Sequence, residues 1–195
     1  MQYVVKTNNL NFSYRRGFKD IKDMNLLVPQ NSIYGFLGPN GSGKTTTIRL
    51  LLGLLKQKTG QVFFNDQNFK GNRIKCLNNI GALIENPSLY EHLTAKENLI
   101  IAAKYRKDIP KERINEVLEI VNLSHVGNKK IKAFSFGMKQ RLGIAIALLS
   151  KPDLLILDEP TNGLDPKGII EIRALIKELS KKKKDNYIYF KSLIK

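Results

Sequence analysis

The sequence predicts an α/β fold with a parallel β-sheet, because apolar strand patterns alternate with helical ones along the chain. Three continuous apolar runs are typical of parallel strands, and they cover residues 32–38, 79–85 and 153–159. Helical periodicity lies between and after these runs, at residues 45–55, 94–105, 111–121, 137–149 and 168–179. Domains with this alternation pack their helices on a parallel sheet.

Two parts of the chain depart from this alternation. Residues 1–30 and 60–69 alternate apolar and polar side chains between turn formers, which predicts short antiparallel strands. Residues 87–149 carry little strand pattern, so we expect a helical insertion over about that range. With 195 residues, the chain 1–195 is expected to form a single domain that includes both additions.

The chain is strongly basic, with 33 lysines and arginines, 17 aspartates and glutamates, and a formal net charge of +16. No zinc-finger, basic-zipper or RNA-binding aromatic pattern accompanies the lysines, which favours a solvated basic surface over a nucleic-acid partner. The single Cys76 cannot form an intrachain disulfide, which is typical of a reducing, cytosolic setting. No apolar run is long enough to span a bilayer, so we expect any membrane role to come through a partner.

A phosphate-binding loop is expected at residues 38–45, which read GPNGSGKT and match G-x-x-x-x-G-K-S/T between a strand and a helix. Glycines let backbone N–H groups turn toward a phosphate chain, and the start of the next helix adds its positive dipole end. Lys44 would bring a positive charge to the β and γ phosphates, and Thr45 would offer its hydroxyl to Mg²⁺. A glycine-rich turn without a ligand is the alternative. The expected ligand-binding residues are Gly38, Pro39, Asn40, Gly41, Ser42, Gly43, Lys44, Thr45 and Thr46.

A second motif, LLILDE at residues 154–159, ends an apolar strand in two acids. Asp158 can place a carboxylate near Mg²⁺, and Glu159 can polarise a water molecule for attack on the γ phosphate. Two acids at a strand end are common by themselves, and a solvated strand end is the alternative. Together with the loop at residues 38–45 they indicate phosphoryl transfer.

With these motifs the sequence resembles the ATP-binding subunit of ABC transporters over about residues 4–179. The segment FSFGMKQ at 134–140 is similar to the family's LSGGQ signature, with Ser135 and Gly137 on its serine and second glycine. A plain helix cap is the alternative for Ser135. TNGLDP at 161–166 resembles the D-loop, with Asp165 on its aspartate, and Tyr14 is similar to the aromatic residue that stacks on adenine. The resemblance implies a P-loop NTPase fold, with a RecA-like parallel sheet core, an antiparallel β subdomain and a helical insertion.

One position indicates a branch of the family. Most members have a glutamine between the sheet and the helical insertion, whereas this chain has Glu85. An acid at this position, like the SFGMKQRLGIA segment, resembles the branch that exports or confers resistance to bacitracin and lantibiotics. Glu85 could reach Mg²⁺ or its attacking water as a charged ligand. A surface glutamate at a strand end is the alternative.

The resemblance also implies a mechanism and its partners. ATP and Mg²⁺ are the expected cofactors, and two subunits are expected to dock head to tail with each ATP between them. Lys44 is then assigned to the phosphates, Thr45 and Asp158 to Mg²⁺, Glu159 to the attacking water, and Ser135, Gly137 and Asp165 to the subunit interface. A membrane permease subunit would contact residues 87–90, which places the protein in the cytoplasm, on the inner face of the cell membrane.

The family has one more feature, a strand after the D-loop helix that ends in a histidine contacting the γ phosphate. His92 and His125 both precede Asp158, so neither can be this switch histidine. Synonymous codons for DNYIYFKSLIK (185–195), read one base later, give ITIFISSHLL, a β-branched strand with a histidine. We therefore expect residues 181–195 to be an aberrant tail, caused by a frameshift near the lysine run 181–184. A native basic tail is the alternative.

Three functions remain open from the sequence. The first is an ATPase subunit of a peptide-antibiotic exporter, with turnover impaired by the changed tail. The second is a remnant that binds nucleotide without turnover. The third is a soluble ABC ATPase that acts on ribosomes or nucleic acid. The positive charge could suit this function, whereas a short chain with a single cassette does not.

Overall fold

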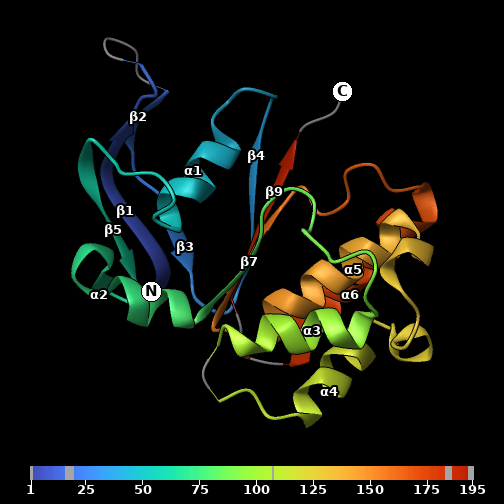
Figure 1. Ribbon diagram of the computed structural model, residues 1–195. Helices are drawn as coiled ribbons and strands as arrows, with labels where there is room; N and C mark the ends of the chain where they lie inside the picture. Colours follow the sequence, from blue (N-terminus) through green and yellow to red (C-terminus); the bar gives the residue numbers. More distant parts are fainter. Residues whose placement is uncertain (1, 16–19, 107, 183–185, 193–195) are drawn as a thin grey trace.

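A parallel sheet runs through the middle of the molecule, with an antiparallel sheet on one side and a group of helices on the other (Figure 1). This arrangement comes from a computed structural model of the chain. The structure describes residues 2–15, 20–106, 108–182 and 186–192, and side chains as far as Ser180.

The antiparallel sheet is built from the N-terminal segment and residues 59–68. Its strands follow the order β2-β1-β5-β6, and β3 also pairs with β1. The expectation of antiparallel strands in these two segments is confirmed. The strands are β1 (Tyr3–Phe12), β2 (Ile21–Met24), β3 (Leu27–Pro29), β5 (Thr59–Phe64) and β6 (Gln67–Asn68).

The second sheet has the order β4-β9-β8-β7, and all its neighbouring strands are parallel. This confirms the three predicted parallel strands. The register pairs Gly38 with Ser192 and Asp158 with Phe190, so β9 separates the strand before the phosphate-binding loop from the strand that ends in Asp158. The strands are β4 (Ile33–Gly38), β7 (Ile80–Leu83), β8 (Leu154–Asp158) and β9 (Asn186–Ser192).

Most helices lie close to their predicted ranges. The exception is α2, which no periodicity predicted; it begins where the Asn68 side chain accepts a hydrogen bond from the Lys70 backbone N–H at 2.9 Å. Two short 3₁₀ turns, Ser124–Val126 and Ile131–Ala133, connect α4 to α5. The helices are α1 (Lys44–Leu51), α2 (Phe69–Asn78), α3 (Ala95–Lys104), α4 (Glu112–Ile120), α5 (Phe136–Leu148) and α6 (Pro166–Lys182).

Strand β9 follows α6, as the family's histidine-bearing strand follows the D-loop helix, and it lies in the middle of the parallel sheet. Its backbone pairs along its whole length with β4 on one side and with β8 on the other. The backbone of segment 187–190 therefore completes the middle of the sheet. The lysine run 181–184 lies partly outside the described residues, and residues 193–195 lie wholly outside them.

Strand β8 lies between two hydrophobic cores. Leu155 and Leu157 pack among the side chains of α3, α4, α5 and α6, whereas Leu154 and Ile156 pack with α1 and the antiparallel sheet. Because successive residues of a strand point to opposite faces, one buried strand joins both cores. The end of β8, where Asp158 lies, is therefore held on both faces.

Strand β4 is less buried than its apolar sequence predicts. Tyr34 and Phe36 pack against the core beneath α1, but Ile33 and Leu37 are 47% and 56% exposed. The prediction of a strand buried on both faces is wrong for β4. Its apolar run is buried on alternate residues only, on the face that packs with the core around α1.

Gly81 on β7 gives a direct test of the contact between the sheet and α5. A Cβ atom at this position would lie 2.2 Å from the Ala147 carbonyl oxygen and 3.0 Å from its carbonyl carbon. Because this neighbour is helix backbone, Gly81→Ala should push α5 away and lower the free energy of unfolding by about 1–3 kcal/mol. Chemical denaturation measures this loss. Gly71→Ala, at an open position in α2, is the matched control and should not destabilise the chain. Equal stability of both variants would contradict the close packing of β7 on α5.

Candidate functional site

The loop between β4 and α1 has the backbone shape of a phosphate-binding loop. Gly41 and Gly43 have φ angles of 80° and 86°, which glycine adopts without strain. A Cβ atom on Gly43 would lie 2.6 Å from Ile21 Cδ1, so the loop also packs too tightly against β2 for a larger residue. Gly43 is the N-cap of α1, and its carbonyl accepts a hydrogen bond from the Thr47 N–H at 2.8 Å. The first turn of α1 is thus directed at the loop.

Lys44 is held inside this loop. Its Nζ donates to the carbonyl oxygens of Gly38 at 3.0 Å and Pro39 at 2.9 Å, and the residue is 6% exposed. The same ammonium lies 3.8 Å from Glu159 Oε1. Because backbone carbonyls hold the lysine at the loop, its charge is available to an anion that binds there.

Thr45 connects the loop to the end of β8. Its Oγ1 donates a 2.7 Å hydrogen bond to Asp158 Oδ2. Asp158 is 3% exposed, and its Oδ1 atom has no hydrogen-bond partner. Burial raises the pKa of Asp158, the Thr45 hydrogen bond acts in the opposite direction, and the charges of Glu159 and Glu85 raise it further.

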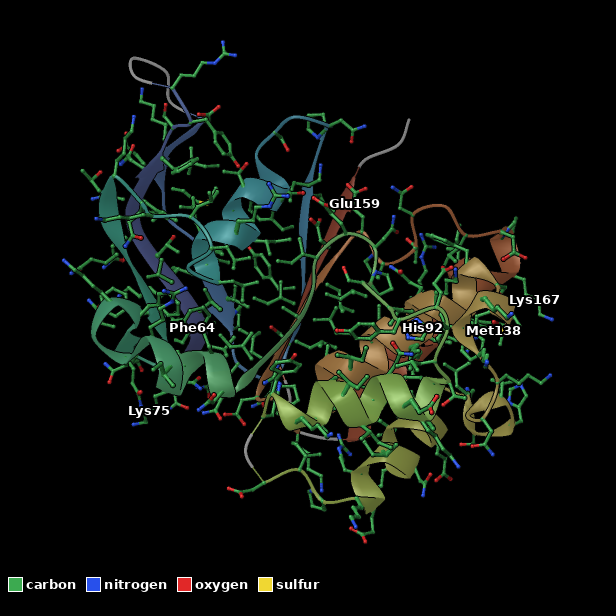
Figure 2. The ribbon with its side chains drawn as sticks, viewed as in Figure 1. Phe64, Lys75, His92, Met138, Glu159 and Lys167 are labelled. Carbon is green, nitrogen blue, oxygen red and sulfur yellow. The ribbon has the colours of Figure 1, made fainter. Side chains whose placement is uncertain are left out.

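These groups line a cavity of about 320 Å³. The sequence predicted Thr45, Glu85, Asp158 and Glu159 as site residues, and the structure brings these four together. Asn86, Gln140 and Asn162 also line the cavity and were missed. The sequence offered no distinguishing signal for Gln140, because it lies between the polar residues Lys139 and Arg141. Figure 2 shows Glu159 at the end of the central sheet, away from His92 on the helical side.

Glu85 lies beside the cavity but also has another partner. Its Oε1 is 2.8 Å from Arg49 Nη2 on α1. Both side chains are largely exposed, so this ion pair contributes little stability. Glu85 and Glu159 both adopt positive φ angles, 59° and 44°, which direct the chain sharply at the ends of β7 and β8.

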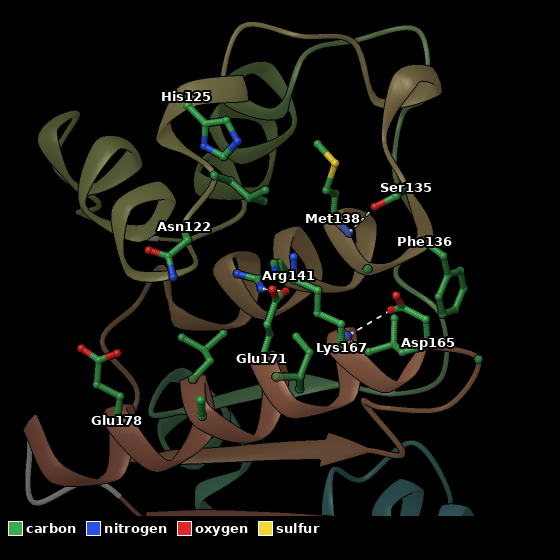
Figure 3. A pocket seen from close by; sticks show the side chains of 18 residues that line it. Asn122, His125, Ser135, Phe136, Met138, Arg141, Asp165, Lys167, Glu171 and Glu178 are labelled. Carbon is green, nitrogen blue, oxygen red and sulfur yellow. Dashed lines mark hydrogen bonds and ion pairs between the residues drawn. The ribbon is translucent and has the colours of Figure 1, made fainter.

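Ser135, Gly137 and Asp165 form a second group, which lines a separate groove of about 790 Å³ between α5 and α6 (Figure 3). The Ser135 hydroxyl caps α5 by accepting the Met138 N–H at 3.3 Å, and Asp165 caps α6 by accepting the Gly168 N–H at 3.0 Å. His125 lies in this groove too. Among the residues that the structure describes, none lines both the groove and the cavity at Asp158, so this group lies apart from the cavity of its own chain.

Tyr14 is 56% exposed at the end of the segment that follows β1. Its ring packs edge-on against Phe12 with centroids 4.8 Å apart, and its N–H donates to Asp20 Oδ2 at 2.8 Å. The Asp20 carbonyl would lie 3.5 Å from a Cβ atom on Gly43. Tyr14 is therefore joined through Asp20 to the phosphate-binding loop, with its ring available for stacking.

Comparison with known proteins identifies the family and supports the fold. The family model described as ABC transporter matches residues 21–162, from β2 to the segment after Glu159. The chain belongs to the ABC transporter family. Among solved structures, cbiO1 from Clostridium perfringens, part of the ABC transporter complex cbiONQ, covers 98% of this chain and 79% of its own with a TM-score of 0.88 and 29% identity. The ADP conformation of MJ1267, an ATP-binding cassette of an ABC transporter, gives a TM-score of 0.86 at 26% identity and covers 100% of this chain and 83% of its own.

Sequence relatives of this ABC protein carry transport names. The bacitracin transport ATP-binding protein BcrA of Bacillus licheniformis is 52% identical over 94% of the chain, and the lantibiotic transport ATP-binding protein SrtF of Streptococcus pyogenes is 39% identical over 89%. The chain spans 60% of the length of BcrA and 73% of that of SrtF. Within the described residues, no helix is long and apolar enough to cross a membrane.

The cavity of this ABC protein fits Mg²⁺ bound together with phosphates. Magnesium usually takes one or two protein oxygens and completes its shell with phosphate oxygens and water. The residues that would hold it are Thr45 and Asp158, whose orphaned Oδ1 needs a partner, with Glu85 nearby. Among the described residues, no cluster of three histidine, cysteine, aspartate or glutamate side chains forms a self-contained metal site.

The raised pKa of Asp158 gives a pH-dependent prediction. An acid whose folded pKa is raised stabilises the fold below its ordinary value, 3.8, and loses that contribution as pH rises through the folded pKa. At pH 7.5 the buried charge therefore destabilises the ligand-free chain. Asp158→Asn should raise the unfolding temperature at this pH by about 2–4 °C, and the gain should shrink as pH falls.

Thermal unfolding followed from pH 8 down to the ordinary pKa of an aspartate, 3.8, measures this difference. Asp66→Asn, an exposed position in the β5–β6 turn, is the matched control and should follow the unmodified chain at every pH. A pH-independent effect of Asp158→Asn would show that burial of its charge is not the cause.

Proposed function

We propose that this chain is the ATP-binding and ATP-hydrolysing component of an ABC transporter. The observation that carries the proposal is that Thr45, Asp158 and Glu159 line one cavity and that Lys44 lies beside it. Thr45 Oγ1 is 2.7 Å from Asp158 Oδ2, and Lys44 Nζ is 3.8 Å from Glu159 Oε1. These side chains come from two motifs more than a hundred residues apart. A lysine, a hydroxyl and two carboxylates are the groups needed to bind a nucleoside triphosphate and to activate water.

Each side chain has a defined task in this proposal. Lys44 and the N–H groups of the loop hold the β and γ phosphates, and Thr45 and Asp158 hold Mg²⁺. Bound Mg²⁺ supplies positive charge that offsets the charge on the phosphate oxygens. Glu159 Oε accepts a hydrogen bond from the attacking water and takes its proton as the oxygen attacks the γ phosphorus. The bond from that phosphorus to the β–γ bridging oxygen breaks, so ADP leaves and inorganic phosphate is formed. Tyr14 stacks on adenine, and Glu85 contacts the metal or its water.

The groove between α5 and α6 is assigned to a second subunit. Ser135 and Gly137 lie at the start of a helix, where hydroxyl and N–H groups favour an anion, but they lie apart from Lys44. A head-to-tail dimer resolves this separation, because each subunit then offers its signature segment to the ATP of the other. Asp165 would lie at the same interface.

The transported compound and the location are also proposals. The relatives named for bacitracin and lantibiotic transport, together with Glu85, support a peptide-antibiotic exporter. The chain would act in the cytoplasm, bound to the inner face of the membrane through a permease subunit. Residues 87–90 would contact this permease, and Tyr90 among them is 49% exposed. Nothing in the site favours a nucleic-acid partner.

The proposal includes reduced turnover by this chain. Strand β9 places residue 192 beside Gly38, at the end of the phosphate-binding strand, and residue 192 is a serine. In the shifted reading of the tail, the switch histidine falls at this same position. A nucleotide-binding remnant without turnover is therefore the second candidate function, and it is favoured by this serine.

Two substitutions test the main proposal. Glu159→Gln should lower ATP hydrolysis at least about 100-fold with little change in ATP affinity, because it removes the base and keeps the shape. Lys44→Ala should lower ATP affinity about 10- to 100-fold, since it removes charged hydrogen bonds to phosphate. Steady-state turnover and equilibrium binding of a fluorescent ATP analogue are the measurements. Lys75→Ala, on the exposed helix α2, is the control for loss of a lysine. Full hydrolysis by Glu159→Gln would rule out the assigned base.

The reduced turnover has its own test at residue 192. Ser192→His should raise turnover about tenfold or more, because residue 192 pairs with Gly38 at the end of the phosphate-binding strand and the family resemblance implies that a histidine at this strand end contacts the γ phosphate. Ser192→Asn is the control for polarity, and replacement of residues 185–194 by ITIFISSHLL is the complete restoration. If the unmodified chain turns over as fast as the restored one, the tail does not impair it. If binding is intact and no variant hydrolyses ATP, the remnant is the better description.

A further inference from the structure

Gln140 is a buried polar group at the site for which the proposed chemistry gives no role. It lies on α5, is 2% exposed and lines the same cavity as Thr45 and Asp158. Within the described part of the chain, Gln140 Oε1 and Asp158 Oδ1 are the two buried side-chain oxygens without a hydrogen-bond partner. Leaving such a group without a partner is unfavourable, so two of them at one cavity point to a bound species.

The chemistry of these two atoms limits what can bind. Both are acceptors, so they cannot satisfy each other, and each needs a donor. A water molecule has two donor hydrogens and can bridge two acceptors. The cavity of about 320 Å³ is much larger than the roughly 30 Å³ that a water occupies in the liquid. It has room for a hydrated cation as well as for the bridging water.

We propose that Gln140 is a positioning residue for the divalent cation, because its Oε1 accepts a hydrogen bond from a water of the Mg²⁺ shell that Asp158 Oδ1 also holds. This inference rests on the proposed function, since Mg²⁺ enters with ATP. Magnesium keeps several of its waters in protein sites, and acceptors in the second layer of contacts orient them. A neutral amide does this without adding charge to a cavity that already has three carboxylates.

The position of Gln140 on α5 places it on the same helix as Ser135, which is assigned to the ATP of the other subunit. Ser135 caps the start of this helix and lines the groove assigned to the second subunit, and Gln140 follows one and a half turns later. One rigid helix therefore carries a group for the ATP of each subunit. A shift of α5 would change the metal environment of its own site and the signature contact of the other.

The test compares the affinity for a fluorescent ATP analogue with Mg²⁺ and with EDTA, on the complete chain. The ratio of the two affinities measures the coupling between metal and nucleotide. Gln140→Leu should lower this ratio about fivefold, which corresponds to a lost hydrogen bond of about 1 kcal/mol, and should leave the affinity in EDTA unchanged. Gln140→Glu, measured at pH 8, keeps an acceptor oxygen and should restore the ratio.

Controls separate this role from a purely structural one. Gln61→Leu makes the same chemical change at an exposed position of β5 and should leave the ratio unchanged. If Gln140→Leu lowers thermal stability without nucleotide and leaves the ratio intact, then Gln140 donates directly to Asp158 and the inference is wrong. In that case the proposed function stands, because the unmodified chain still binds nucleotide with Mg²⁺. Absence of nucleotide binding by the unmodified chain would overturn both.

Discussion

The hydrogen bond between Thr45 Oγ1 and Asp158 Oδ2 is the interaction on which the site depends. It joins the first turn of α1 to the end of β8, although another strand lies between β8 and the strand that leads into α1. The distance between these two elements must therefore be correct for the hydroxyl and the carboxylate to meet. Once they meet, the carboxylate is removed from water, and the chain accepts a buried charge with one oxygen satisfied and one not.

This arrangement exchanges stability for affinity. Three carboxylates, Asp158, Glu159 and Glu85, lie around one cavity, and Lys44 and Arg49 offset only part of their charge. Like charges around one cavity repel each other, and burial increases the free-energy cost of keeping each carboxylate charged. Under the proposed function, a doubly charged cation bound with nucleotide would relieve both problems, so the repulsion among the carboxylates would favour its binding. Sites that are pre-organised in this way are commonly less stable without their ligand.

The sequence located the parts of the site that consist of consecutive residues. The loop from Gly38 to Thr45 and the pair Asp158 and Glu159 each carry their chemistry within one short segment, so a local pattern was enough. Arg49 and Gln140 could not be found in this way, because their roles depend on which elements pack together in three dimensions. The contact of Arg49 with Glu85 joins α1 to the end of β7, and Gln140 lines the cavity because α5 packs against β7.

In the fold, too, local features were predicted from the sequence and features that depend on tertiary packing were not. Strands and helices with a clear period were predicted within a few residues, whereas α2 was missed because its apolar residues do not gather on one face. The exposure of Ile33 and Leu37 was missed for a different reason. An apolar run shows that a strand can be buried on both faces, but the number of layers that cover it is a property of the whole fold.

The strand order has a consequence for the moment at which the site forms during synthesis. Strand β9 comes last along the chain among the described strands, yet it lies between β4 and β8 in the sheet. A nascent chain can complete the phosphate-binding loop and even β8 while the slot between them is still empty. Thr45 and Asp158 cannot take up their final distance until β9 has left the ribosome and inserted. Nucleotide therefore cannot guide early folding through this contact, and a change in β9 acts on the site after nearly all of the described chain has been made.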